Sequence, residues 1–322
     1  MRIKVYFAIG LIFMTLQFGA NAQSPQIKFG FPGLYPEGVT FNPTSKLFYV
    51  SSVTTAAIGS VDMKGNYKLV FQDSTMKSTY GLKIDPTGKV LWACVSDANY
   101  SKYSNPSTFK KKARIIAVDL TSGKKVKDID LASLSEGKHF INDIAFDNDG
   151  NMYATDSFSP VIFKVDKGGT ASVFVKNDLF KSQDIGLNGI AFHTDGFLIV
   201  NNNSAGALLK VGIKDPGKIS RVKVKNLFPG ADGMLFDKSG NLVLVQNKGV
   251  DKVFQLASKD GWQSAEVIAS TSAEDRFQQP STNTLADNQV YVLNSKLNEL
   301  SDPIKRPSKE FTIQLVQFRP VK

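Results

Sequence analysis

Residues 141–157 read INDIAFDNDGNMYATDS, and this stretch decides the fold. It consists of an apolar run, a turn rich in Asn, Asp and Gly, and a second apolar run, an order typical of a β-hairpin with a short polar turn. The same order recurs in five other stretches: PEGVTFNPTSKLFYVSS (36–52), TYGLKIDPTGKVLWACV (79–95), LNGIAFHTDGFLIVNNN (187–203), ADGMLFDKSGNLVLVQN (231–247) and PSTNTLADNQVYVLNS (280–295). The sequence therefore contains six copies of one hairpin.

In most copies, two more apolar runs follow the hairpin, such as VIFKVD and ASVFVK after the third one. Four runs per unit predict a four-stranded blade. We call the residue just before the first apolar run of each unit its register residue. The six register residues are Glu37, Tyr80, Asn142, Asn188, Asp232 and Ser281. They are separated by 43, 62, 46, 44 and 49 residues. Units of this length predict an all-β fold, a six-bladed β-propeller of four-stranded blades around a central channel.

A β-sandwich and a parallel β-helix are the alternative folds, and the regular four-run unit argues against both. A closed ring also needs its ends to pair. We expect the segment QIKFGF (26–31) or the segment EFTIQLVQF (310–318) to complete it, and the sequence does not say which strand pairs with which.

The first 22 residues, MRIKVYFAIGLIFMTLQFGANA, combine a basic start, an apolar stretch and an A-x-A ending. They predict a secretory signal peptide (1–22) followed by a single propeller domain (23–322). The apolar stretch is shorter than the roughly 20 residues that cross a bilayer, so no membrane span is expected. The single cysteine, Cys94, excludes an internal disulfide and is expected to be a buried thiol. An exported chain without disulfides fits a bacterial periplasm or secretion.

The composition is that of a folded protein, with 42% hydrophobic and 21% charged residues. Lys and Arg number 39 against 29 Asp and Glu, giving a formal net charge of +10. The basic residues form no helix or aromatic-basic stripe, so we expect single lysines on surface turns and no nucleic-acid partner.

The register residues should meet at one mouth of the channel, because a hairpin places the start of its first strand beside the end of its second. Four of them carry carboxylate or amide oxygens: Glu37, Asn142, Asn188 and Asp232. Oxygen donors without imidazole or thiolate are what calcium prefers. Turn dipeptides such as Asn-Gly are the alternative explanation, but the hairpin turns lie several residues later. The ends of the second strands are expected at the same mouth: Ser51, Cys94, Asp156, Asn202, Gln246 and Asn294.

The phrases PEGVTF, INDIAFDNDGNMYATDS, LNGIAF and ADGMLFDKSGN resemble those of the senescence marker protein, gluconolactonase and luciferin-regenerating enzyme family of six-bladed propellers. The resemblance runs over essentially the whole chain after the leader. It implies that Glu37, Asn142, Asn188 and Asp232 ligate one divalent cation, commonly calcium, and that Asp232 stands where the family places its proton-shuttling acid. Members that act on sugar lactones tend to carry an arginine where this chain has Phe140, which favours a less polar substrate.

A cation in a dry, concave mouth polarises a carbonyl oxygen and stabilises the oxyanion formed when water attacks. The sequence therefore predicts a metal-dependent carboxylic-ester hydrolase acting on a small lactone or ester. Asp232 is the first choice of base, His139 is an alternative, and metal-bound water without a protein base is a third. A non-catalytic propeller that binds a ligand or protein at the same mouth is the alternative function, and a condensation like that of strictosidine synthase is a more distant one.

The second unit is longer than the others because of residues 97–114, DANYSKYSNPSTFKKKAR. This loop is expected over the mouth, with Tyr100, Tyr103 and Phe109 as an aromatic lid and with Lys110 in a positive flank. A solvated surface loop is the alternative. Residues 295–310 are expected to face the same way.

Overall fold

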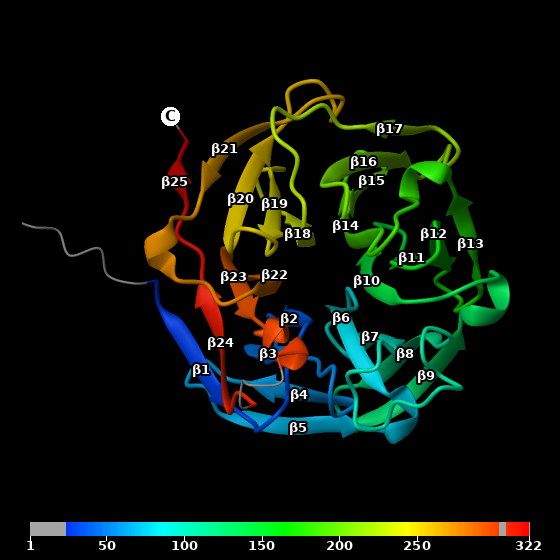
Figure 1. The fold of residues 1–322 in the computed structure, drawn as a ribbon, viewed down its shortest axis with the longest axis vertical. Helices are drawn as coiled ribbons and strands as arrows, with labels where there is room; N and C mark the ends of the chain where they lie inside the picture. The colour runs from blue at the N-terminus through cyan, green and yellow to red at the C-terminus, as the bar shows by residue number, and fades with distance from the viewer. Residues whose placement is uncertain (1–23, 303–306, 322) are drawn as a thin grey trace, which may run out of the picture.

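The computed structural model describes residues 24–302 and 307–321. The predicted signal peptide (1–22) lies outside the described residues. Six antiparallel sheets surround a central channel (Figure 1), which confirms the predicted all-β, six-bladed propeller. Within the described ranges, no helix is of sufficient length and apolar character to cross a bilayer.

The first three blades follow one another along the chain, each with its innermost strand first. Blade one comprises β2 (Val39–Asn42), β3 (Leu47–Val50), β4 (Ala57–Val61) and β5 (Tyr67–Gln72). Blade two comprises β6 (Ser78–Ile84), β7 (Val90–Ser96), β8 (Ala113–Asp119) and β9 (Lys124–Asp130). Blade three comprises β10 (Ile141–Phe146), β11 (Met152–Asp156), β12 (Val161–Val165) and β13 (Ala171–Lys176).

The remaining blades keep the same order. Blade four comprises β14 (Leu187–His193), β15 (Phe197–Asn202), β16 (Ala207–Gly212) and β17 (Ile219–Arg221). Blade five comprises β18 (Ala231–Phe236), β19 (Leu242–Gln246), β20 (Lys252–Ala257) and β21 (Glu266–Ser270), and blade six begins with β22 (Pro280–Ala286) and β23 (Gln289–Asn294). Short 3₁₀ turns connect strands: η1 (Ser74–Met76), η2 (Ala132–Leu134), η3 (Asp178–Phe180), η4 (Ala273–Asp275) and η5 (Leu297–Ser301).

Both ends of the chain help to close the ring. Strand β1 (Gln26–Gly30) pairs antiparallel with β24 (Glu310–Leu315), and together they complete blade six. Strand β25 (Arg319–Pro320) adds to the outer edge of β21 in blade five. The buried Asp275 links these ends, because its carboxylate accepts hydrogen bonds from Ser24 Oγ (3.0 Å) and Arg319 Nη1 (2.7 Å). Both end segments identified in the sequence therefore contribute to closure.

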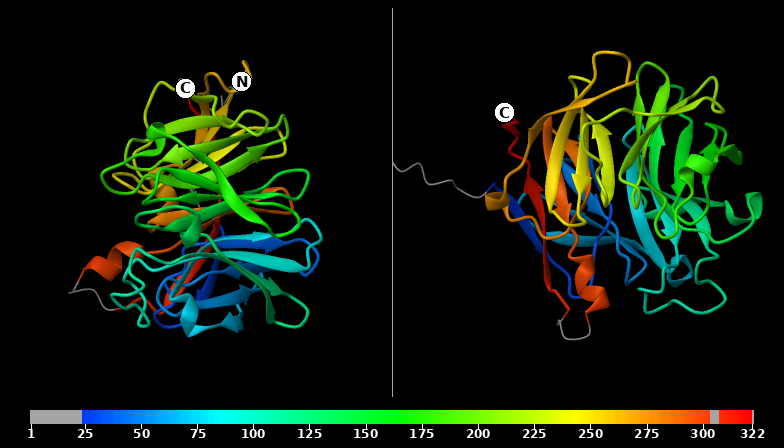
Figure 2. Two further views of the ribbon diagram at one scale, coloured as in Figure 1. Left: turned by 90° about the vertical axis from the view of Figure 1, so that its right-hand side faces the viewer. Right: turned by 45° about the horizontal axis from the view of Figure 1, so that its top comes forward.

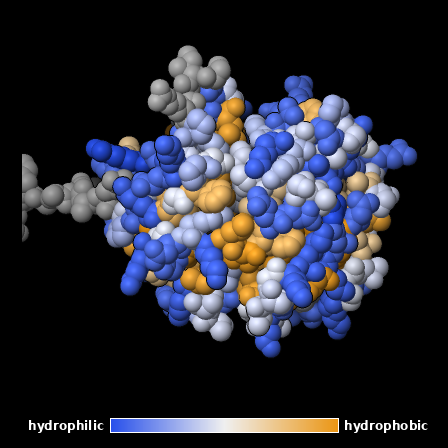
Figure 3. Space-filling view, turned by 90° about the horizontal axis from the view of Figure 1, so that it is seen from below, coloured by the Kyte–Doolittle hydropathy of each residue, from blue (hydrophilic) through white to orange (hydrophobic). Residues whose placement is uncertain are grey.

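The hydrophobic core lies between the faces of neighbouring blades. In one cluster, Tyr153 and Ile162 of blade three pack with Ile190 and Leu198 of blade four. Burial decreases toward the rim, since the innermost β2 is fully buried while the outermost β5 and β9 are largely exposed. Figure 3 shows the molecule from below the view of Figure 1. On this side, hydrophobic residues form a central patch that is surrounded by hydrophilic residues.

Five of the six innermost strands carry a β-bulge at their mouth end. In β10 the pairing register shifts between Ile141 and Ile144, which leaves Asn142 and Asp143 outside the ladder. The register residues of the other four bulged strands occupy the same place: Tyr80, Asn188, Asp232 and Ser281. We expected these residues just before the strands, and the structure corrects this. A bulge turns a side chain out of the sheet's alternation and toward the channel.

The residue after the register position is glycine in four units, and close packing against the next innermost strand explains why in each of them. A Cβ on Gly81 would lie 2.6 Å from the carbonyl oxygen of Asn142, and one on Gly189 would overlap the carbonyl oxygen of Asp232. Glycine therefore allows the backbones of adjacent innermost strands to approach closely. This approach brings successive register residues together around a narrow channel.

Candidate functional site

The four predicted ligand residues line one cavity of about 340 Å³ at a mouth of the channel. All four are buried and come from four different blades: Glu37, Asn142, Asn188 and Asp232. Tyr80 from blade two lies in the same lining, whereas Ser281 of blade six donates its hydroxyl to the carbonyl of Glu37 (2.6 Å). The predicted convergence is therefore confirmed, and the role of these residues as metal ligands stays a prediction.

Four buried side-chain oxygens of residues that line this cavity lack a hydrogen-bond partner among the described residues: Glu37 Oε2, Tyr80 Oη, Asn142 Oδ1 and Asn188 Oδ1. Three of them are carboxylate or amide oxygens of the predicted ligand residues. Asn142 is held with its oxygen free because its Nδ2 donates to Ser157 Oγ (3.0 Å). An unsatisfied buried polar atom costs about 1–3 kcal/mol. Three such oxygens lie at one cavity beside the Asp232 carboxylate, and this arrangement suits a metal cation, which accepts electron pairs from oxygen. The donor set, two carboxylates and two amides, fits a hard divalent cation such as Ca²⁺.

The amide oxygens are essential to this fit. In the part of the chain that the structure describes, no three His, Cys, Asp or Glu side chains are arranged to hold a metal ion. Among the described residues, the cavity lining offers two carboxylates, those of Glu37 and Asp232, so a cation held there would need Asn142 and Asn188 as its remaining protein ligands. Such a set carries a charge of −2, which matches one divalent ion.

Burial raises the pKa of the acids around this cavity. For Glu37, burial and the nearby charges of Asp232 and Asp143 raise the pKa well above its ordinary value, against the opposing charge of Lys83. For Asp232, burial raises the pKa to about 7, although hydrogen bonds from Asn247 and Asn188 oppose the shift. Burial also raises the pKa of Asp143. Without a bound cation, each of these acids therefore keeps its proton to a higher pH than an exposed carboxyl group does.

The free energy of unfolding of the cation-free protein is expected to fall as the pH rises from about 4 toward 8. The pKa values of Glu37, Asp143 and Asp232 are higher in the folded state than in the unfolded state, so the native state binds more protons. The resulting stabilisation is fully present at a pH below the unfolded-state pKa, and it is lost as the pH rises through the folded-state pKa. Thermal unfolding in chelator between pH 4.5 and 8 measures this loss. Saturating calcium should remove most of it, and identical profiles with and without calcium would contradict the assignment.

Two asparagines missed by the sequence analysis also line the cavity, each just after a second strand. Asn247 Nδ2 donates to Asp232 Oδ2 (2.6 Å) and to the carbonyl of Pro280 (2.9 Å). Asn203 Nδ2 donates to the carbonyl of Ala231 (2.8 Å). The only signal in the sequence was an Asn at the end of the phrases NNN and QN.

The second-strand ends that we expected at the mouth are instead used to hold the backbone. Asn202 Nδ2 donates to the carbonyl of Lys181 (3.2 Å), and Gln246 Nε2 donates to that of Pro229 (2.8 Å). In blade two the strand continues past Cys94 to Ser96, which pairs with Ser78. Cys94 is buried, as predicted. The Asn side chains that line the mouth in blades four and five therefore lie one residue further along the chain than the hairpin pattern indicated.

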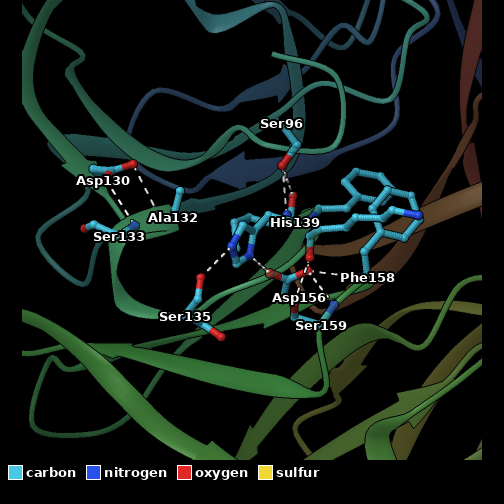
Figure 4. Close-up of polar contacts among 12 residues, drawn as sticks. Ser96, Asp130, Ala132, Ser133, Ser135, His139, Asp156, Phe158 and Ser159 are labelled. Carbon is cyan, nitrogen blue, oxygen red and sulfur yellow. Dashed lines mark hydrogen bonds and ion pairs between the residues drawn. The ribbon is translucent and has the colours of Figure 1, made fainter. Parts of the chain in front are cut away.

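His139 is not among the described residues that line this cavity. Its Nδ1 is 2.6 Å from Asp156 Oδ2 and its Nε2 is 2.9 Å from the carbonyl oxygen of Ser135 (Figure 4). Because both ring nitrogens face acceptors, the doubly protonated imidazolium suits the site. Burial lowers the pKa of His139, but the hydrogen bond and charge of Asp156 outweigh it and the pKa is raised. An imidazolium has no lone pair for a proton, so this arrangement does not favour His139 as the base.

Replacing Asp156 with alanine is expected to lower the free energy of unfolding by about 3–5 kcal/mol, because it leaves the buried His139 without its partner. The same carboxylate accepts backbone N–H groups of Phe140, Phe158 and Ser159 at 2.9–3.1 Å. Urea denaturation measures the change. Asp195→Ala, at an exposed hairpin turn, is the matched control and should change stability by less than about 0.5 kcal/mol. Equal stability of the two variants would contradict a structural role for Asp156.

Two loops project from the same face of the ring, the 97–112 loop and the loop that contains η5 (Figure 2). Tyr100 of the first and Leu297, Asn298 and Ser301 of the second line the cavity. Of the predicted lid aromatics, Tyr103 packs against the core between blades one and two, and Phe109 lies outside the lining with Lys110 over its ring. The predicted aromatic lid is therefore reduced to Tyr100.

No family model and no curated protein sequence matches this chain. Its structure is similar to the major allergen Mala s 1 of Malassezia sympodialis, with a TM-score of 0.72 and 19% identity, covering 92% of this chain and 97% of that one. It is similar to a luciferin-regenerating enzyme, with a TM-score of 0.63 and 13% identity over 93% and 99% of the chains. It is also similar to a gluconolactonase from Xanthomonas campestris, with a TM-score of 0.59 and 14% identity over 91% and 90%.

These neighbours are six-bladed β-propellers. At such identities the similarity establishes the fold. They include the gluconolactonase and luciferin-regenerating enzyme that the sequence motifs resemble, so the resemblance is confirmed at the level of the fold.

Proposed function

We propose that this protein is an exported, calcium-dependent hydrolase of a small lactone or other carboxylic ester. The observation that carries the proposal is the cavity with three unpartnered, buried carboxylate and amide oxygens beside Asp232. The gluconolactonase and luciferin-regenerating enzyme among the structural neighbours support a hydrolase-type activity. Export to a bacterial periplasm or medium rests on the leader-like residues 1–22 alone.

Each residue of the cavity has a part in the proposed reaction. Glu37 and Asp232 supply negative charge for holding a divalent cation, and Asn142 and Asn188 supply neutral oxygens. When bound, the cation would act as a Lewis acid toward the substrate carbonyl. Asn247 donates to Asp232 Oδ2 and fixes the orientation of that carboxyl group.

Hydrolysis requires a proton acceptor close to the attacking water. The water oxygen bonds to the carbonyl carbon, Asp232 accepts one water proton, the acyl C–O bond breaks, and Asp232 returns this proton to the leaving alkoxide. Burial raises the pKa of Asp232 to about 7 in the cation-free protein, and a bound cation would lower it, so the ligating carboxylate would be ionised and would act as a weak base.

The proposal is tested with the mature protein, a panel of lactones and aryl esters, and a chelator. Turnover that disappears on chelation and returns with added calcium supports a calcium-dependent hydrolase. Turnover indifferent to chelation would rule out the metal. Calcium-dependent binding of panel members without turnover would favour the alternative, a non-catalytic propeller that binds a ligand or protein at this mouth.

A further inference from the structure

Part of the cavity wall is apolar, although the floor and the rest of the wall are polar. Six apolar or aromatic side chains from five blades line the cavity: Val53, Tyr80, Tyr100, Phe140, Ile185 and Leu297. The polar remainder outside the predicted ligand residues consists of Asn203, Asn247, Gln279, Asn298 and Ser301. Phe140 stands among them with its ring edge-on to Tyr80 (centroids 4.5 Å apart) and 5.3 Å from Phe158. A substrate that reaches the floor must therefore contact hydrophobic surface.

Phe140 and Tyr80, but not the exposed Tyr100, are held in place before any substrate binds. The Phe140 N–H donates to Asp156 Oδ1 (2.9 Å), and its carbonyl accepts from Ser157 N–H (2.8 Å). Tyr80 is only 2% exposed, so neither ring can swing freely. A preorganised apolar wall binds an apolar group without an ordering cost.

The cavity also has no positive side chain to meet an anionic substrate. Among the described residues that line it, none is Lys, Arg or His. Glu37 and Asp232 offset the charge of one divalent cation, and the buried Asp143 and the charge of Lys83 nearby oppose each other. Lys110 does not change this balance, because it lies over the rings of Phe109 and Phe158 outside the cavity lining. A free carboxylate or phosphate on the substrate would remain unpaired there.

Resting on the proposed hydrolase function, we infer that the substrate is an uncharged lactone or ester with a hydrophobic alkyl or aryl group, which lies against Phe140, Tyr80 and Tyr100. The hydroxyl groups of a polyhydroxylated sugar lactone that face Phe140 and Tyr80 would lose water without gaining a partner from the Phe140 ring. Phe140 is the specificity-determining residue, since it joins the wall directly to the strand that carries Asn142.

The test uses calcium-loaded protein and δ-lactones with methyl, propyl, pentyl and heptyl side chains, compared with glucono-δ-lactone. The kcat/KM should rise about two- to fourfold per methylene until the cavity is full. Phe140→Ala should flatten this dependence. If Phe140→Ala is unstable, the variants Phe140→Leu and Tyr100→Ala replace it in the test. Each should reduce the dependence of kcat/KM on the length of the alkyl side chain. Phe109→Ala, an aromatic truncation outside the lining, is the matched control and should behave as the parent.

A binding arm separates this inference from the hydrolase proposal. Lactams with the same alkyl side chains resist hydrolysis, and calorimetry should show their affinity increasing with chain length in the parent but not in Phe140→Ala. If lactam affinity increases with chain length but no lactone is hydrolysed, the hydrolase proposal is wrong and the hydrophobic binding site is supported. Turnover without dependence on chain length, or glucono-δ-lactone as good as the heptyl lactone, would overturn the inference and leave the hydrolase standing.

Discussion

At saturating calcium, the Asp232→Asn variant is expected to hydrolyse the best lactone substrate about 10² to 10⁴ times more slowly than the parent, with the loss in kcat. Asparagine keeps an oxygen of nearly the same size and position, but it removes the negative charge and the capacity to accept a proton. Excess calcium restores cation occupancy, so the remaining loss reports proton transfer. Steady-state kinetics over a calcium titration separates the two effects.

Asp195→Asn serves as the control for this variant because Asp195 is exposed at the opposite, hairpin-turn end of blade four. It should match the parent. An Asp232→Asn variant within a few-fold of the parent at full occupancy would show that Asp232 is not the base. The reaction would then depend on water activated by the cation alone, since both ring nitrogens of His139 are engaged elsewhere.

The Glu37→Gln variant is expected to bind calcium at least about 100-fold more weakly than the parent. Replacing residues that only support metal ligands typically costs 10–100-fold, and this change removes a ligand's charge directly. Titration calorimetry measures the affinity. Asn142→Ala should weaken binding less, because it removes a neutral donor. Glu299→Gln, which alters a partner of Tyr35 outside the cavity lining, should bind calcium like the parent. Unchanged affinity of both Glu37→Gln and Asn142→Ala would show that the site is misassigned.

The blades were predictable because their signals are local. A hairpin turn such as DNDGN and the apolar runs around it lie within 17 residues, and six copies reinforce one another. Closure was not predictable in the same way. Gln26 pairs with Gln314, and no local pattern states whether the first strand, the last strand or both complete a blade.

The convergence of the four predicted ligand residues could be predicted because a repeat brings equivalent residues to equivalent places. Asn203 and Asn247 were not, because an Asn after a strand looks like any turn residue until the neighbouring blade is in place. His139 shows the opposite limit. It is three residues from Asn142 in sequence, yet its side chain is tied to Asp156 and Ser135 outside the cavity. Distance along the chain near an irregular strand start does not determine where a side chain points.

The most direct measurement of the central claim is a crystal structure of the mature protein grown with calcium, with the ion located by its anomalous scattering. We predict one calcium ion with oxygens of Glu37, Asn142, Asn188 and Asp232 at about 2.3–2.6 Å. An ion bound by other residues, or a cavity that stays free of calcium at millimolar concentration, would contradict the account.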